Sequence, residues 1–195
     1  MKRKTTKKLI VLVCTGNTCR SPMAEAVFKT FAVNEGLTKL KIRSAGLRAK
    51  KGDALNPKSA QILAEAGLEL PEFKPARLTP AMLRQSFAVV CMTDSQRDLV
   101  MEMRWQAFKD TETDVEELEN NVYSFSELAG YEVLDPYGKD IDCYRYVYRL
   151  IENAKTVVLH KLVPDNMRAK FKETVKKQTG TTRKKKTNDF ETKEK

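Results

Sequence analysis

The residues best suited to chemistry lie near the N-terminus, where a cysteine is followed, after five residues, by an arginine and a serine. The stretch reads Cys14-Thr15-Gly16-Asn17-Thr18-Cys19-Arg20-Ser21. A short loop that leaves a strand and enters a helix turns successive backbone N–H groups inward, and the helix N-terminus adds about half a positive charge. Such a loop can hold a tetrahedral oxyanion, so this spacing indicates chemistry on a phosphate group.

Each residue type in the loop has a physical reason to be there. Gly16 permits backbone conformations that other residues resist, and Asn17 is among the few others that tolerate the left-handed region. The planar fork of Arg20 can grip two phosphate oxygens, which a lysine cannot match. Cys14, at the floor of the loop, would feel the amide dipoles and this guanidinium, and both favour the nucleophilic thiolate. Ser21 could donate a hydrogen bond to the sulfur and stabilise it as a leaving group.

In-line displacement at phosphorus also needs an acid opposite the nucleophile, and Asp135 is the candidate. It stands in the turn Asp135-Pro136-Tyr137-Gly138. It would protonate the leaving atom and then accept a proton from the water that hydrolyses a phosphocysteine. The residues alone leave plainer alternatives open: a turn aspartate for Asp135, a surface ion pair for Arg20, and a small buried apolar residue for Cys14.

Apolar patterning predicts the elements that must position these residues. Residues 9–13 form a short apolar run typical of a strand buried on both faces. Pro22 stands where a helix takes its first residue, with Ser21 as its cap, and this helix is expected to end near Gly36. Further strands are expected at 39–44, 87–92 and 122–125, and further helices at 56–67, 79–86, 94–104 and 140–163.

The alternation of strands and helices predicts an α/β fold with a parallel sheet. In such sheets, ligands bind in the crevice beyond the carboxyl ends of the strands. The loop from Cys14 to Ser21 lies at such an end, and Asp135 is expected at another loop of the same sheet edge.

Positive charge is concentrated at the two ends of the chain, whose net charge is +10. Residues 1–8 carry five basic residues and no acid, and residues 164–195 carry a net charge of +6, which leaves −1 for residues 9–163. We therefore expect a folded domain over 9–163 between two basic extensions, 1–8 and 164–195, the second of them disordered. A nucleic-acid-binding domain usually carries its positive charge on a folded face. A nucleic-acid partner is thus not expected, although a tail that binds RNA, an acidic protein or a membrane surface stays open.

The remaining composition argues against several other classes of protein. The apolar run at 9–13 is too short for a membrane span or a signal peptide. One histidine and four scattered cysteines supply neither a zinc site nor a disulfide framework. The expectation is a cytoplasmic, monomeric protein without a metal or cofactor, whose cysteines are free: Cys14, Cys19, Cys91 and Cys143.

Residues 11–25 closely resemble the active-site signature of the low-molecular-weight protein tyrosine phosphatases. Arg43-Ser44-Ala45-Gly46 is similar to the second landmark of that family, whose serine hydrogen-bonds the loop asparagine, and Asp135-Pro136-Tyr137-Gly138 is similar to its general-acid motif. The resemblance covers about residues 8–163. It implies a four-stranded parallel sheet flanked by helices in three layers, the phosphatase I-like, Rossmann-like fold.

The same resemblance implies roles for individual residues. Cys14 would be the nucleophile, Arg20 the phosphate binder and Asp135 the acid. Three further residues would hold the loop in shape: Asn17, Ser21 and Ser44. The substrates would be phosphorylated proteins.

Thr18 bears on which phosphorylated residue is the substrate. The loop resembles that of the bacterial protein-arginine phosphatase branch, which has threonine where tyrosine-specific members usually have an aliphatic residue. The Thr18 hydroxyl could orient a polar guanidinium, or it could simply cap a loop amide. Tyr137 stands at the rim in place of the paired aromatics of many tyrosine-specific members. We therefore expect a phosphatase that acts on phosphoarginine, with phosphotyrosine as the alternative.

The cysteines leave two further questions open. The resemblance suggests a reversible disulfide between Cys14 and Cys19 that protects the nucleophile, although Cys19 could merely pack under the loop. An arsenate reductase would need two further cysteines on a nearby helix, which Cys91 in a strand and Cys143 in the terminal helix do not supply. A module that binds phosphorylated residues without turnover is the other remote alternative. A nucleotide-binding P-loop is excluded because no Gly-Lys-Ser/Thr follows the loop.

Overall fold

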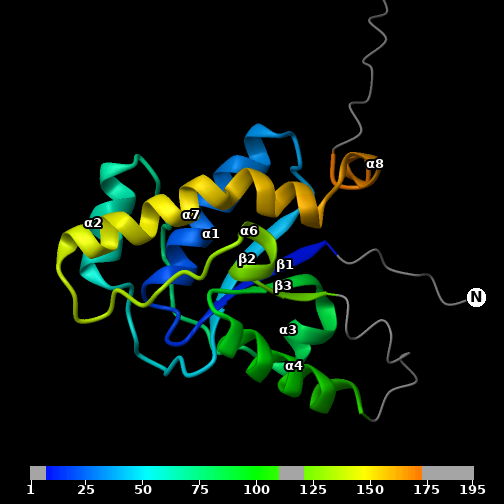
Figure 1. The fold of residues 1–195 in the computed structure, drawn as a ribbon, viewed down its shortest axis with the longest axis horizontal. Helices are drawn as coiled ribbons and strands as arrows, with labels where there is room; N and C mark the ends of the chain where they lie inside the picture. Colours follow the sequence, from blue (N-terminus) through cyan, green and yellow to red (C-terminus); the bar gives the residue numbers. More distant parts are fainter. Residues whose placement is uncertain (1–7, 110–120, 173–195) are drawn as a thin grey trace, which may run out of the picture.

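A sheet of four parallel strands forms the centre of the computed structural model, which describes residues 8–109 and 121–172 (Figure 1). The strand order is β2-β1-β3-β4, so β1 and β3 are central and β2 is an edge strand. The strands are β1 (Leu9–Cys14), β2 (Lys41–Gly46), β3 (Ser86–Cys91) and β4 (Val122–Ser124). All pairs are parallel, with Leu9 opposite Lys41 and Cys14 opposite Gly46. The predicted α/β class is confirmed.

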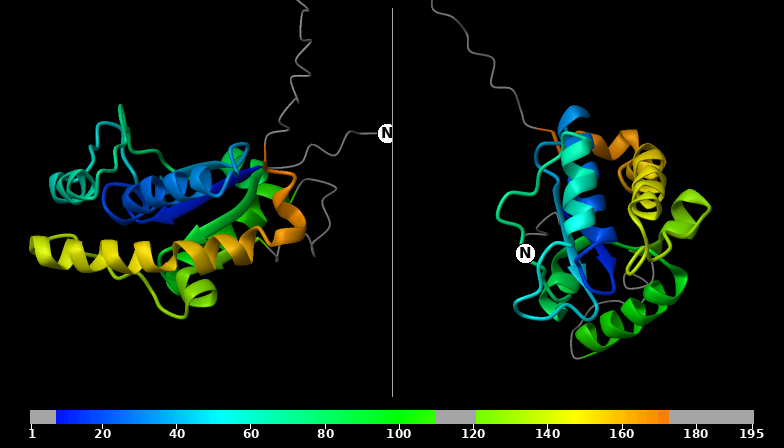
Figure 2. Two further views of the ribbon diagram at one scale, coloured as in Figure 1. Left: turned by 90° about the horizontal axis from the view of Figure 1, so that it is seen from above. Right: turned by 90° about the vertical axis from the view of Figure 1, so that its left-hand side faces the viewer.

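Helices cover both faces of the sheet and complete three layers (Figure 2). One face packs against α1 (Arg20–Asn34) and α7 (Ile141–Leu162), and α2 (Pro57–Glu65) contacts both of these helices. The other face packs against α3 (Pro80–Gln85) and α4 (Asp94–Phe108). Successive strand residues point to opposite faces. Ile10 and Leu12 therefore enter the core under α1 and α7, whereas Val11 and Val13 enter the core beside α3 and α4.

Two helical features differ from the sequence expectation. The first helix begins at Arg20 rather than Pro22, and its N-cap is Cys19, with no side-chain cap hydrogen bond. The expected cap, Ser21, was wrong because its hydroxyl is engaged with the Cys14 sulfur instead. The five-residue helix α6 (Phe125–Ala129) was not predicted, although Ser124 and Glu127 form a capping box that marks its start.

The folded chain continues past residue 163, where the expected basic extension begins. The short helix α8 (Asp165–Arg168) follows, and Phe171 is fully buried in the core beneath α1 and α7. Its carbonyl accepts a hydrogen bond from Lys39 N at 2.8 Å, and Arg168 pairs with Glu35. The boundary expected at 163 is therefore too early, because an aromatic side chain beyond it completes the core. Residues 1–7 and 173–195 lie outside the described residues.

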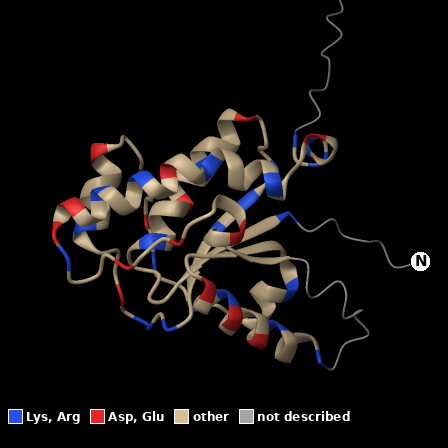
Figure 3. Ribbon diagram, in the orientation of Figure 1, with Lys and Arg blue, Asp and Glu red and all other residues tan. Residues whose placement is uncertain are grey.

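Basic and acidic residues are interspersed along the helices of the described chain (Figure 3). This arrangement agrees with the near-zero net charge of residues 9–163. Within 8–109 and 121–172, no helix is long and apolar enough to span a bilayer.

Candidate active site

The Cys14 sulfur lies where β1 ends, beside the first turn of α1. It is 3.0 Å from Ser21 Oγ and accepts a hydrogen bond from Asn17 N at 3.3 Å. Asn17 has a φ of 56°, the left-handed conformation expected from its residue type, and it is fully buried. The turn at Asn17 directs its N–H back onto the Cys14 sulfur, so the loop folds over the end of β1.

Asn17 is fixed by contacts from two directions. Its Nδ2 donates to Ser21 Oγ at 3.0 Å, and its Oδ1 accepts from Ala76 N at 2.8 Å. Ala76 lies in the segment between α2 and α3, and its carbonyl also accepts a hydrogen bond from Gly46 N. These bonds hold the asparagine from the side of β2, where the sequence predicted Ser44 to act.

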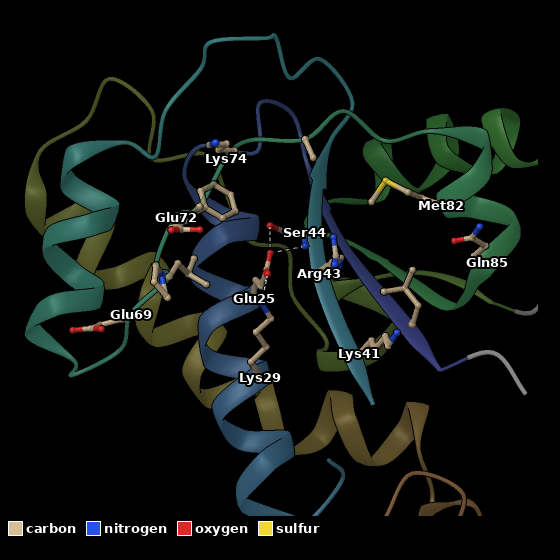
Figure 4. Close-up of a pocket in the computed structure, with 15 residues that line it drawn as sticks. Glu25, Lys29, Lys41, Arg43, Ser44, Glu69, Glu72, Lys74, Met82 and Gln85 are labelled. Carbon is tan, nitrogen blue, oxygen red and sulfur yellow. Dashed lines mark hydrogen bonds and ion pairs between the residues drawn. The ribbon is translucent and has the colours of Figure 1, made fainter. Parts of the chain in front are cut away.

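The expected hydrogen bond between Ser44 and Asn17 was wrong. Both donors of Ser44 go to Glu25 Oε2 instead, with the hydroxyl at 2.5 Å and the backbone N–H at 2.7 Å (Figure 4). Glu25 is buried on α1, and its other oxygen pairs with Lys29 at 2.5 Å. Ser44 therefore ties β2 to α1, the helix that follows the loop.

Arg20 and Asp135 lie together, although they are far apart in sequence. The Nη2 of Arg20 is 2.5 Å from Asp135 Oδ2 and donates to Thr15 Oγ1 at 3.4 Å, while Nη1 donates to Val133 O at 3.2 Å. The side chain of Arg20 is only 4% exposed, so the surface ion pair left open above is excluded. Its Nε is buried without a partner among the described residues. That N–H donor is suited to an oxyanion in the pocket.

Gln96 is a site residue that the sequence reasoning missed. Its Nε2 donates to Thr15 Oγ1 at 3.1 Å from the first turn of α4, which Thr93 caps. Gln96 is buried, and its Oε1 has no partner among the described residues. The sequence did carry a signal, because Thr93 and Asp94 follow β3 at the same sheet edge as Cys14.

A pocket of about 330 Å³ lies beside Cys14, Arg20 and Asp135. Eight of its lining residues were predicted for the site: Cys14, Thr15, Gly16, Thr18, Cys19, Arg20, Asp135 and Tyr137. Two more, Lys50 and Asp53, come from the loop after β2 and were not predicted. Tyr137 is 70% exposed and stands at the rim. The arrangement places a sulfur nucleophile, a guanidinium and a carboxyl group around one small pocket.

Cys19 also lines this pocket, and its sulfur is buried. It is 3.4 Å from the hydroxyl of Tyr144 and 3.6 Å from Thr18 Oγ1. Burial raises the pKa of Tyr144, and its contact with Cys19 adds to that shift. Cys14 and Cys19 are both free thiols, and their redox pairing stays a prediction.

The other thiols lie elsewhere. Cys91 is completely buried in β3, where desolvation raises its pKa, and Cys143 is half-buried on α7. Neither lines the pocket, so neither is placed for the disulfide relay of an arsenate reductase. In the described part of the chain, no cluster of residues could hold a metal ion.

The comparison with known families decides which enzymes the chain belongs with. The model of the low molecular weight phosphotyrosine protein phosphatases matches residues 9–177. The chain belongs to this family. It is a hydrolase of the protein phosphatase class, as the sequence predicted, and its substrates are phosphoproteins.

Relatives with both substrate preferences are similar to this phosphatase. A protein-arginine-phosphatase from Bacillus subtilis (strain 168) is 33% identical over 136 residues, which cover 70% of this chain and 84% of that protein. The low molecular weight protein-tyrosine-phosphatase PtpB from Staphylococcus epidermidis is also 33% identical, over 144 residues, which cover 73% of this chain and 90% of that protein.

Solved structures confirm the fold. A YwlE mutant from Bacillus subtilis superposes with a TM-score of 0.67 at 30% identity, covering 79% of this chain and 97% of that one. The tyrosine phosphatase AmsI from Erwinia amylovora gives a TM-score of 0.66 at 28% identity, covering 83% and 97%. Sequence identity to named arginine and tyrosine phosphatases, 33% in both cases, therefore does not decide between the two substrate classes.

Proposed function

We propose that this phosphatase removes phosphate from phosphoarginine residues of proteins through a phosphocysteine on Cys14. The observation that carries the chemistry is the convergence of the Cys14 sulfur, Arg20 and Asp135 on one pocket at the N-terminus of α1. Thr18 lines the same pocket and supports arginine as the phosphorylated residue, together with the similarity to a protein-arginine-phosphatase.

In the first step, the Cys14 thiolate attacks phosphorus. The S–P bond forms while the P–N bond breaks, and the electron pair of that bond goes to the leaving nitrogen. Asp135, in its protonated form, gives its proton to that nitrogen and the arginine side chain is released. The buried guanidinium of Arg20 and the amides of the loop stabilise the phosphoryl oxygens throughout this step.

In the second step, water attacks the phosphocysteine. The Asp135 carboxylate accepts the proton of the water, the O–P bond forms, and the S–P bond breaks with its electron pair returning to sulfur. Ser21 Oγ, 3.0 Å from the sulfur, donates a hydrogen bond that stabilises the departing thiolate. Inorganic phosphate leaves and the thiolate is restored.

Phosphotyrosine is the second candidate substrate, and one observation favours it. Tyr137 is 70% exposed at the rim, where its ring could stack on an aromatic substrate side chain. The similarity to named tyrosine phosphatases points the same way.

A direct comparison of two peptides tests the proposal. The peptides share one flanking sequence and carry either phosphoarginine or phosphotyrosine at the same position. We expect kcat/KM to favour phosphoarginine by about tenfold or more, a ratio that polar complementarity in a pocket can supply. An equal ratio would contradict the preference for phosphoarginine, and a reversed ratio would assign the pocket to phosphotyrosine.

A further inference from the structure

The loop after β2, residues 47–56, is hydrogen-bonded at both of its ends to the loop Cys14–Ser21, the phosphate-binding loop. Leu47 N donates to Cys14 O at 3.0 Å, and Arg48 N donates to Thr15 O at 2.8 Å. At the far end, Asn56 N donates to Thr18 O at 2.9 Å before Asn56 caps α2. These bonds anchor both ends of the loop to the residues that would bind phosphate.

Asp53 lies at that tip in a hydrogen-bonded turn. Its Oδ2 accepts from Lys50 N at 2.8 Å, its own N–H donates to Lys50 O at 3.2 Å, and Gly52 between them has a φ of +93°. Lys50 and Asp53 both line the pocket that contains Cys14. The Oδ1 of Asp53 has no partner among the described residues, so one carboxylate oxygen is free to accept a hydrogen bond.

The negative charge of a carboxylate on the rim of a phosphate pocket can distinguish between phosphorylated substrates. It repels the phosphate dianion of every substrate, and it recovers that cost only where a cation follows the phosphate. Phosphoarginine has a guanidinium bonded to the phosphorus, whereas phosphotyrosine has a neutral ring there. Lys50 attracts both dianions, so it does not discriminate between them. The other carboxylate in the pocket, Asp135, already binds Arg20 and accepts from Tyr137 N at 3.2 Å.

We propose that Asp53 is a specificity-determining residue, whose carboxylate accepts an N–H hydrogen bond from the guanidinium of phosphoarginine and disfavours phosphotyrosine. This inference rests on the proposed function. It assigns the preference to two lining residues of the pocket, Thr18 with its hydroxyl and Asp53 with its carboxylate.

Asp53→Asn tests the inference, because asparagine keeps an oxygen for Lys50 N and removes only the charge. We expect kcat/KM for the phosphoarginine peptide to fall about three- to tenfold, and kcat/KM for the matched phosphotyrosine peptide to rise or stay unchanged. The loss should shrink at high salt, since the rim is exposed. Asp165→Asn is the matched control, because the Asp165 side chain is 97% exposed on α8 and does not line the pocket that contains Cys14. It should leave kcat/KM unchanged for both peptides.

Four outcomes would overturn the proposal or its basis. An equal fall on both peptides would mean that Asp53 only supports the loop, and no change on either would mean that it does not contact substrate. A loss confined to peptides with basic flanking residues would mean that Asp53 binds the flank instead of the guanidinium. If the wild-type enzyme hydrolyses phosphotyrosine but not phosphoarginine, the proposed function itself fails, and that result is visible before any variant is made.

Discussion

Arg20 joins three parts of the site through one guanidinium. It reaches the loop at Thr15, the chain before the acid at Val133, and the acid Asp135 itself. A charge buried this deeply is costly unless it is paired and hydrogen-bonded. Its Nε has no partner among the described residues, so a bound oxyanion would complete its hydrogen bonding. A bound phosphate would therefore offset part of the cost of burying the Arg20 guanidinium.

Thr18 gives a prediction at the scale of one hydroxyl. Thr18→Ile should move the ratio of kcat/KM from phosphoarginine toward phosphotyrosine by about tenfold, because the pocket loses a polar group and gains apolar surface for a ring. Thr18→Val is the matched control, since it removes the hydroxyl and keeps the branched shape. We expect it to lower the phosphoarginine rate without the full gain on phosphotyrosine. If the ratio of kcat/KM for the two substrates stays unchanged in both variants, Thr18 does not determine substrate preference.

Sequence reasoning found the contiguous loop and the distant turn at Asp135 and Tyr137, which both carry motifs, and missed site residues that belong to no motif. The loop from Cys14 to Ser21 was predictable because its spacing carries the chemistry. Gln96 and Glu25 were not, because a glutamine in a first helical turn and a glutamate in a helix look like ordinary surface residues. Ser44 likewise donates to Glu25 and not to Asn17, because the acceptor that lies nearer is decided by the folded structure.

At the scale of elements, β2 and the phosphate-binding loop are in close contact. A Cβ on Gly46, the last residue of β2, would lie 2.8 Å from Asn17 N, 2.8 Å from Gly16 C and 2.9 Å from Thr15 O. All three are backbone atoms of the loop, so none can rotate away. The last residue of β2 must therefore be glycine for the loop to close on its oxyanion.

Gly46→Ala should accordingly damage activity more than stability. We expect an aryl phosphate to be hydrolysed with kcat/KM about 100-fold lower, because the loop must shift, at a cost of about 1–3 kcal/mol in the free energy of unfolding. Gly67→Ala is the control, with a φ of +65° and open space around the position. It should cost about 1 kcal/mol through backbone strain and leave activity unchanged. Full activity in folded Gly46→Ala would contradict this account of the loop.

The free edge of β2 is protected rather than open to pairing. Lys41 and Arg43 project from it into a groove of about 930 Å³, and Glu25 occupies the backbone N–H of Ser44 (Figure 4). Charged residues at a sheet edge discourage association with another strand. Nearer its carboxyl end, Gly46 is already paired with Arg77.

The limits of the sequence prediction for elements have local physical causes. The strands β1 and β3 were predictable because they are continuous apolar runs, and β2 because apolar residues alternate with charged ones at its start. The start of α1 was misplaced because Pro22 is a strong first-turn signal, whereas the helix begins earlier and Ser21 is drawn to the Cys14 sulfur. α6 was missed because five residues are too few to show a helical period, although its capping box was visible in the sequence.

At the scale of the molecule, the strand order creates the site. The chain passes from β1 to β2 on one side and then to β3 on the other, so the connections diverge at the carboxyl ends of β1 and β3. Ligands bind at such a divergence in open α/β sheets. Cys14 ends β1, Gln96 follows β3, and Asp135 reaches the same edge from beyond β4. The apolar patterns of the sequence predicted the strands but not their order, which tertiary packing decides.

The extent of the domain is also a property of the whole molecule. Composition placed the end of the fold at 163 because the following residues are strongly charged. A single aromatic residue outweighs that trend, since Phe171 is fully buried and its ring lies 5.4 Å from that of Phe87. Burying such a ring contributes about 1.5–3 kcal/mol, enough to hold a short polar segment against the core.

The central claim is that the Cys14 sulfur receives the phosphoryl group. Rapid acid quenching during turnover, followed by mass spectrometry of the intact protein and its peptides, tests it directly. We expect one phosphoryl adduct on the peptide that contains Cys14, and we expect Cys14→Ala to show neither adduct nor turnover while keeping the circular dichroism spectrum of the wild type. Turnover by folded Cys14→Ala, or an adduct on another residue, would contradict the account.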